Sequence, residues 1–216
     1  MKSLILAIWK WICLKVIANI HWQGLQALFN HGKYWKLTYE DWKELEKHLE
    51  SGYYIILIRR NCHFTTYLIS LGNFIKTGKF GFWSHALMNL EGDVAKKEDF
   101  RLVEATAIGT HFSPFDKIFD CDAVCLLRPK GFTEADWNEA MEGCLAQIGK
   151  PYDTLFNVYQ DNELSCVELD RAALMNACDY EKDFPEFEDM IKKANNLTPE
   201  MFYNCSEFEK ILEIRR

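Results

Sequence analysis

The sequence lacks an excess of positive charge: its 216 residues include 32 Asp and Glu against 25 Lys and Arg, which gives a formal net charge of −7. A general nucleic-acid-binding domain carries a basic face that complements the phosphate backbone. We therefore expect no nucleic acid among the partners, and the acidic surface makes other anionic polymers poor ligands. Internal repeats and low-complexity stretches are also missing, and 49% hydrophobic residues suffice for a sizeable core.

The sequence also lacks the Cys-x-x-Cys pairs that are typical of zinc sites, although it contains eight cysteines. A chain of this length can bury enough surface to fold without disulfides, and free cysteine behaves as a small buried hydrophobe. We expect most of these cysteines to be reduced core residues in a reducing compartment, which indicates a cytoplasmic protein. We expect neither a metal nor another cofactor.

Acidic residues are missing from residues 1–39, which contain five lysines, so the rest of the chain has a net charge of −12 (−7 minus 5). Residues 4–20 are strongly apolar, but this run is short for a membrane span, and Lys10 and Lys15 interrupt it. It has no small-residue cleavage site of the kind that ends a signal peptide.

Residues 1–30 are accordingly predicted to form an apolar, basic helix that precedes a domain of residues 31–216. The lysines fall on different sides of a helical wheel, which is not the pattern of a simple surface-lying amphipathic helix. Two interpretations stay open: the helix contacts a membrane, so that the protein is membrane-associated, or it packs on the domain.

The pattern along the remaining chain favours an α+β domain over an alternating α/β one. Apolar and β-branched runs predict strands at residues 53–58, 85–90, 100–106 and 123–127, with a turn at residues 91–93. Capping residues and apolar periodicity predict helices at residues 38–50, 64–80, 133–148 and 166–177. Residues 109–114 are predicted to be a loop, and the acidic tail is irregular up to a short helix at Thr198.

Cys166 is the candidate nucleophile, because it lies where a loop (residues 161–165) gives way to a helix. A helix N-terminus favours the thiolate, and its free backbone amides can hold an oxyanion. His85 opens one predicted strand and Glu104 lies near the end of the next. If these strands pair, the carboxylate of Glu104 can orient the imidazole and stabilise its charged form. Taken singly, the three also fit a core cysteine, a structural histidine and a solvated strand charge.

Two further histidines are rivals for the role of base. His63 precedes a predicted helix and follows the first strand, so we expect it to line the cleft. His111 lies in the predicted loop of residues 109–114.

Four short motifs occur in order at residues 84–88 (SHALM), 102–105 (LVEA), 148–153 (IGKPYD) and 166–169 (CVEL). Together they resemble the permuted NlpC-type, YiiX-like branch of the papain-like cysteine peptidases and amidases, a distant relative of lecithin:retinol acyltransferase. The resemblance covers residues 38–212. It implies a circularly permuted papain-like fold, with an antiparallel sheet or small barrel and the nucleophile at a helix N-terminus.

The resemblance also implies roles for individual residues. Cys166 is the nucleophile, His85 acts as general base and then acid, and Glu104 orients His85. Tyr152 is expected to contact the oxyanion or the substrate.

The implied activity is hydrolysis of an amide, in a peptide or a cell-wall-type peptide, through a thioester. Val167 departs from the family pattern, which usually has Ser after Cys, and Tyr53 replaces a Gly-Asp at the start of the first strand. Two alternatives stay open: a lipid ester or amide hydrolase or acyltransferase at a membrane, and an inactive binding module on the same fold.

Overall fold

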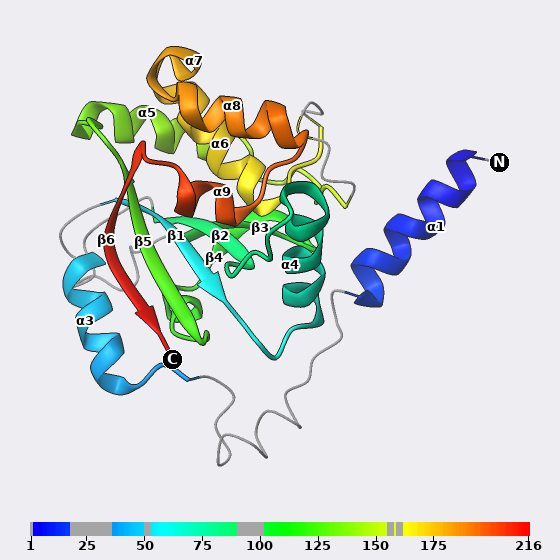
Figure 1. Cartoon of the computed structure of the whole chain (residues 1–216), viewed down its shortest axis with the longest axis horizontal. Coiled ribbons are helices and arrows are strands. Elements are labelled where there is room, and N and C mark those ends of the chain that lie inside the picture. The colour runs from blue at the N-terminus through cyan, green and yellow to red at the C-terminus, as the bar shows by residue number, and fades with distance from the viewer. Residues whose placement is uncertain (1, 18–35, 50–52, 90–101, 155–157, 159–161) are drawn as a thin grey trace.

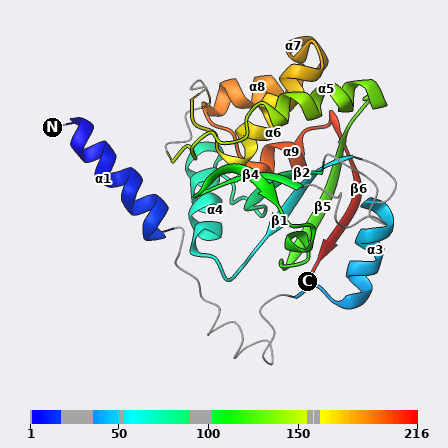
Figure 2. The same cartoon turned by 180° about the vertical axis from the view of Figure 1, so that it is seen from behind.

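The computed structural model describes residues 2–17, 36–49, 53–89, 102–154, 158 and 162–216. Six antiparallel strands form one sheet in the order β4-β3-β2-β1-β5-β6, with helices on both faces (Figures 1 and 2). The strands are β1 (Tyr54–Arg59), β2 (His85–Asn89), β3 (Leu102–Thr106), β4 (Gly109–Ser113), β5 (Ala123–Pro129) and β6 (Phe208–Arg215). The predicted α+β class with an antiparallel sheet is confirmed. Within the described residues the sheet is open, with β4 and β6 at its edges, and is not a barrel.

Strand β1 lies inside the sheet, where it pairs with β2 on one side and β5 on the other. Both faces of the sheet are covered, so residues 54–58 are all buried and form a continuous apolar run instead of an alternating one. Strands β2 and β3 pair as the sequence predicted, with Met88 opposite Val103. The predicted turn at residues 91–93 lies outside the described residues, as do residues 90, 100 and 101 at the ends of two predicted strands.

The loop predicted for residues 109–114 is wrong, because His111 lies on β4, directly opposite Glu104 on β3. Only residues 107 and 108 separate the two strands. The sequence at this turn is Ala-Ile and lacks the Asn-Gly or Asp-Gly signal of a tight hairpin, so the pattern did not reveal it. Gly109 has a φ of +98°, and a Cβ there would lie 2.6 Å from the carbonyl oxygen of Lys150, so the hairpin approaches the turn before Tyr152 closely.

The tail is more regular than predicted. It contains α7 (Tyr180–Asp183) and α8 (Pro185–Ala194), then α9 (Pro199–Asn204), which is the short helix expected at Thr198. Helix α8 begins with a proline and buries Phe187 and Ile191, one turn apart, while charged residues fill its other side. Strand β6 is an edge strand rich in charged residues, which is how edges avoid pairing with other chains, and this charge obscured its strand pattern.

Helices α3 (Tyr39–Leu49), α4 (Phe64–Thr77), α5 (Glu134–Leu145) and α6 (Cys166–Ala177) match the four predicted ones. One core lies between the sheet and the α5–α6 side, and a second lies between the sheet and α3. All eight cysteines are free thiols and six of them are buried, as expected for small core residues.

Helix α1 (Lys2–Lys15) lies on the side of the domain where α4 is found (Figure 1). Trp9, Cys13, Leu14 and Ile17 line the same cavity as residues of the domain, and Lys10 forms an ion pair with Glu163. The predicted boundary between residues 30 and 31 lies outside the described residues. None of the helices that the structure describes is both long enough and apolar enough to span a bilayer.

Candidate active site

Cys166 is the first residue of α6, and only 2% of its surface is exposed. The helix begins with a cap in which the backbone N–H of Ser165 donates to Glu168 Oε2 at 2.7 Å. Glu168 therefore has a structural role in starting this helix. The backbone N–H groups of Ala86 and Val167 donate toward the sulfur, so Cys166 sits where β2 meets the start of α6.

Burial raises the pKa of Cys166 to about 12, and the two backbone amides only partly oppose this effect. For a thiolate buried this deeply, the free-energy cost of losing its water is larger than the stabilisation that the helix N-terminus provides. The expectation that the helix start would keep the resting thiol partly ionised is therefore wrong for this structure. A nucleophilic Cys166 must lose its proton to a base as it attacks.

His85 and Glu104 form a hydrogen-bonded pair, with 2.6 Å between His85 Nε2 and Glu104 Oε2. The pairing of β2 with β3 brings the two side chains together, as the sequence predicted. Glu104 is completely buried, and its other oxygen accepts hydrogen bonds from Ser113 and Lys117. Burial by itself raises the pKa of Glu104, but His85 and Lys117 outweigh it and hold this pKa well below its usual range.

The ionised carboxylate fixes the tautomer of His85, because a carboxylate can only accept and Nε2 must therefore carry the proton. Burial lowers the pKa of His85, Arg60 and Lys117 add to this effect, and Glu104 opposes it. The imidazole is then neutral at neutral pH, with its Nδ1 lone pair available. Among the described residues, Nδ1 has no hydrogen-bond partner. His85 thus has the protonation state of a general base.

This protonation state predicts the pH dependence of activity. His85 accepts a proton only when it is neutral, and burial places its pKa below the ordinary value of 6.5. The acid limb of kcat/KM is therefore expected below pH 6.5, with a plateau at neutral pH, and a full pH–rate profile checks this. An acid limb above pH 6.5 would instead indicate a stable thiolate–imidazolium pair and contradict the neutral resting state.

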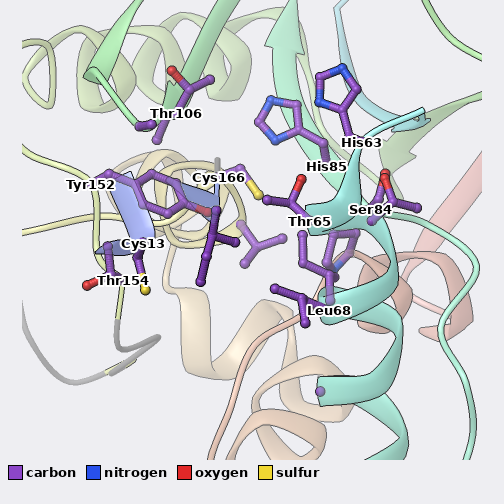
Figure 3. Close-up of a pocket in the computed structure, with 18 of the residues that line it drawn as sticks. Cys13, His63, Thr65, Leu68, Ser84, His85, Thr106, Tyr152, Thr154 and Cys166 are labelled. Atoms are coloured by element: carbon purple, nitrogen blue, oxygen red, sulfur yellow. The ribbon is translucent and has the colours of Figure 1, made fainter. Parts of the chain in front are cut away.

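A cavity of about 620 Å³ brings the candidate residues together (Figure 3). Cys166, His85, Tyr152 and His63 all line it, and Figure 3 shows Cys166 between the Tyr152 ring and His85. Burial raises the pKa of Tyr152 far above its ordinary value, so the phenol keeps its proton and can donate a hydrogen bond.

The rival base His111 is not among the described residues that line the cavity. Its Nε2 lies 3.6 Å from Glu104 Oε1, on the opposite side of the carboxylate from His85. His111 therefore belongs to the surroundings of the carboxylate and is poorly positioned to act on a substrate.

Sequence reasoning missed two partners of Glu104. Ser113 ends β4, and Lys117 lies on the short 3-10 helix η2 (Phe115–Ile118) that follows it. Both approach Glu104 because β4 pairs with β3. The hairpin turn gave no recognisable signal, so no local pattern could have linked these residues to the carboxylate.

No protein-family model matches the sequence, and no curated protein matches it. A crystal structure of the metalloprotein YiiX from Escherichia coli O157:H7 matches the fold with a TM-score of 0.53. The match has 17% sequence identity and covers 76% of this chain and 97% of that chain. The chain has the permuted papain-like fold of YiiX. The expected fold is thereby confirmed, and at this identity the likeness to YiiX concerns the fold alone.

YiiX is described as a metalloprotein, so we asked whether this chain has a comparable ligand set. In the ranges that the structure describes, no three His, Cys, Asp or Glu side chains are grouped as the ligands of a metal ion would be.

Proposed function

We propose that this protein is a cysteine hydrolase that cleaves an amide bond through a thioester on Cys166. The observation that carries the proposal is the hydrogen bond from His85 to the buried carboxylate of Glu104. His85 lines the same cavity as Cys166. A base oriented by a carboxylate next to a nucleophile is the arrangement that nucleophilic catalysis requires. The YiiX-like fold agrees with it.

In the first step, His85 Nδ1 takes the proton of the thiol as Cys166 Sγ attacks the carbonyl carbon. Glu104 stabilises the imidazolium that results. The negative oxygen of the tetrahedral intermediate accepts hydrogen bonds from backbone amides at the start of α6 and from the Tyr152 hydroxyl. The carbon–nitrogen bond then breaks, His85 returns its proton to the leaving amine, and a thioester remains on Cys166.

In the second step, neutral His85 removes a proton from water as the water attacks the thioester. The carbon–sulfur bond breaks, the sulfur regains a proton from His85, and the acid leaves. All proton transfers use one imidazole, so the mechanism derived from these residues needs no further group.

Trapping the thioester tests the proposal. We expect activated acyl esters and acyl anilides to acylate the full chain once, at Cys166, because this thiol lines the cavity with the oriented base His85 and receives backbone hydrogen bonds at the start of α6. Intact-mass measurement followed by peptide mapping locates the adduct, and hydroxylamine should release it as expected for a thioester. Acylation spread over several of the eight cysteines, or none at all, would contradict the proposal.

A second candidate function is hydrolysis or transfer of a lipid acyl group, and the character of the cavity favours it. Apolar side chains of α1 and α4, including Trp9, Leu14, Leu68 and Ile69, form part of the wall near Cys166. Such a wall suits an acyl chain better than a polar peptide. Comparing adduct formation by long-chain and acetyl esters separates the two candidates, because only a lipid enzyme prefers the long chain.

A binding module that has lost turnover is the remaining alternative. Such a module would keep its ligand when Cys166 is replaced by alanine. A hydrolase would also keep its ligand in this variant but would lose the turnover that the wild type shows, so the two are separated by measuring ligand binding and turnover in the wild type and in Cys166→Ala.

A further inference from the structure

Exposed apolar side chains are concentrated on two helices. Among the described residues, 19 large hydrophobic side chains are exposed, and 11 of these belong to α1 and α4. Leu4 and Trp11 on α1 are 64% and 60% exposed, and Ile75 on α4 is 72% exposed. Scattered apolar residues are normal on a protein surface, but their concentration on two helices that line one cavity is typical of an interaction site.

Helix α4 is amphipathic, but it buries its polar side and exposes its apolar side. Its buried residues are Thr66 and Asn73, whose side chains hydrogen-bond to the backbone of Arg60 and Lys79. The opposite side of the helix carries five exposed apolar residues at helical spacing: Tyr67, Leu68, Leu71, Phe74 and Ile75. A helix that only packs on its own domain turns its apolar stripe inward. The apolar stripe of α4 is therefore left exposed by the described residues.

Helix α1 is strongly apolar apart from Lys2, Ser3, Lys10 and Lys15. Trp9, Cys13 and Leu14 turn toward the cavity, and Lys10 forms an ion pair with Glu163 of the domain. Leu4 and Ile8, one turn apart on another side, are 64% and 50% exposed. Apolar side chains on more than one side of a helix favour a core or a lipid environment. The domain contacts only part of α1, so the other apolar side chains of this helix remain exposed.

The charge of these helices indicates which partner covers them. Together α1 and α4 contain four lysines and no acidic residue, and one of the four, Lys10, is paired with Glu163. The net charge of the chain is −7, so removing the +4 of these helices leaves −11 for all other residues. A second copy docked through the same helices would bring the lysines together. An anionic bilayer surface accepts both the apolar side chains and the lysines, while it repels the acidic remainder.

We propose that α1 and α4 form a docking face for an anionic phospholipid bilayer, and that the catalytic cavity opens within this face. The docking face is defined by Leu4, Ile8, Trp11, Leu71, Phe74 and Ile75. Trp9 on α1 and Leu68 on α4 are exposed and also line the cavity, so the face and the cavity are continuous. A docked molecule presents its cavity to lipid. Docking itself does not depend on the proposed function; only the reaction of the lipid at Cys166 rests on it.

Vesicle sedimentation tests the docking face without any need for turnover. The protein is the full chain with Cys166→Ala, and the probes are vesicles of phosphatidylcholine alone or mixed with phosphatidylserine. We expect binding to the mixed vesicles that weakens with added salt and is weaker for phosphatidylcholine alone. The double variants Ile8→Glu/Trp11→Glu and Leu71→Glu/Ile75→Glu should each lower binding by about tenfold or more, because two apolar side chains can no longer enter the bilayer.

The matched control is Leu145→Glu/Met175→Glu, which adds the same charge at exposed apolar residues on α5 and α6 that do not line the cavity. It should keep wild-type binding, and circular dichroism should show every variant folded. Failure to bind the mixed vesicles would overturn the proposal, as would an equal loss in the control. A dimer in light scattering that Leu71→Glu/Ile75→Glu converts to a monomer, with no vesicle binding, would assign the face to a second copy instead. Cys166 acylation is measured separately, so either proposal can fail while the other stands.

Discussion

Replacing Cys166 with alanine is expected to lower kcat by about 10⁴-fold or more on any acyl substrate that the wild type turns over. The reason is that the thioester cannot form without Cys166 Sγ. His85→Ala should cause a loss of similar size, and the double variant should lose no more than either single variant, because the two residues act as one unit. Steady-state kinetics with the acyl substrate used for trapping measures all three.

Cys144→Ala is the matched control. Cys144 is a fully buried thiol on α5, and it does not line the cavity. Its replacement also removes a buried sulfur, so it reproduces the packing loss at Cys166 while leaving the nucleophile and its base intact. Activity within a fewfold of wild type is expected. Turnover that survives Cys166→Ala, or that is lost equally in Cys144→Ala, would exclude Cys166 as the nucleophile.

Glu104→Gln is expected to lower kcat by about 10² to 10⁴-fold, the range for a residue that fixes the tautomer of a catalytic histidine. The amide has one oxygen and one NH₂ group, whereas Glu104 accepts from His85 on one oxygen and from Ser113 and Lys117 on the other. Either orientation of glutamine brings an NH₂ group against a donor. His85 then loses the tautomer that leaves Nδ1 free, or Lys117 loses its buried partner.

The pH profile separates this positioning role from simple loss of stability. Glu104 raises the pKa of His85 against the effect of burial, so its removal should move the acid limb of kcat/KM to lower pH. The control is Glu188→Gln, which neutralises another buried carboxylate, paired with Arg171 at 3.0 Å, away from the cavity. It should lower the thermal midpoint and leave the pH profile unchanged. An unchanged profile in Glu104→Gln would contradict the role assigned to the carboxylate.

Much of the fold could be predicted from the sequence because its signals are local. The apolar run of β1, the cap at Thr38 and the helix beginning at Cys166 depend on residues within a few positions of one another. Strand β4 and strand β6 were missed because their formation depends on partners. Strand β4 forms through a hairpin turn whose sequence has no recognisable turn signal, and β6 is a charged edge strand that is held by pairing with β5.

The sequence by itself determined the order of the motifs, the α+β class and the approach of His85 to Glu104, because neighbouring antiparallel strands pair with little ambiguity. Only the tertiary structure decided the protonation of Cys166, since its pKa depends on burial by segments far apart in the chain. The tertiary structure also decided that α1 lines the cavity and that α4 turns its apolar stripe outward. Local pattern fixes which side of a helix is apolar, but only packing determines whether that side meets the core or remains exposed.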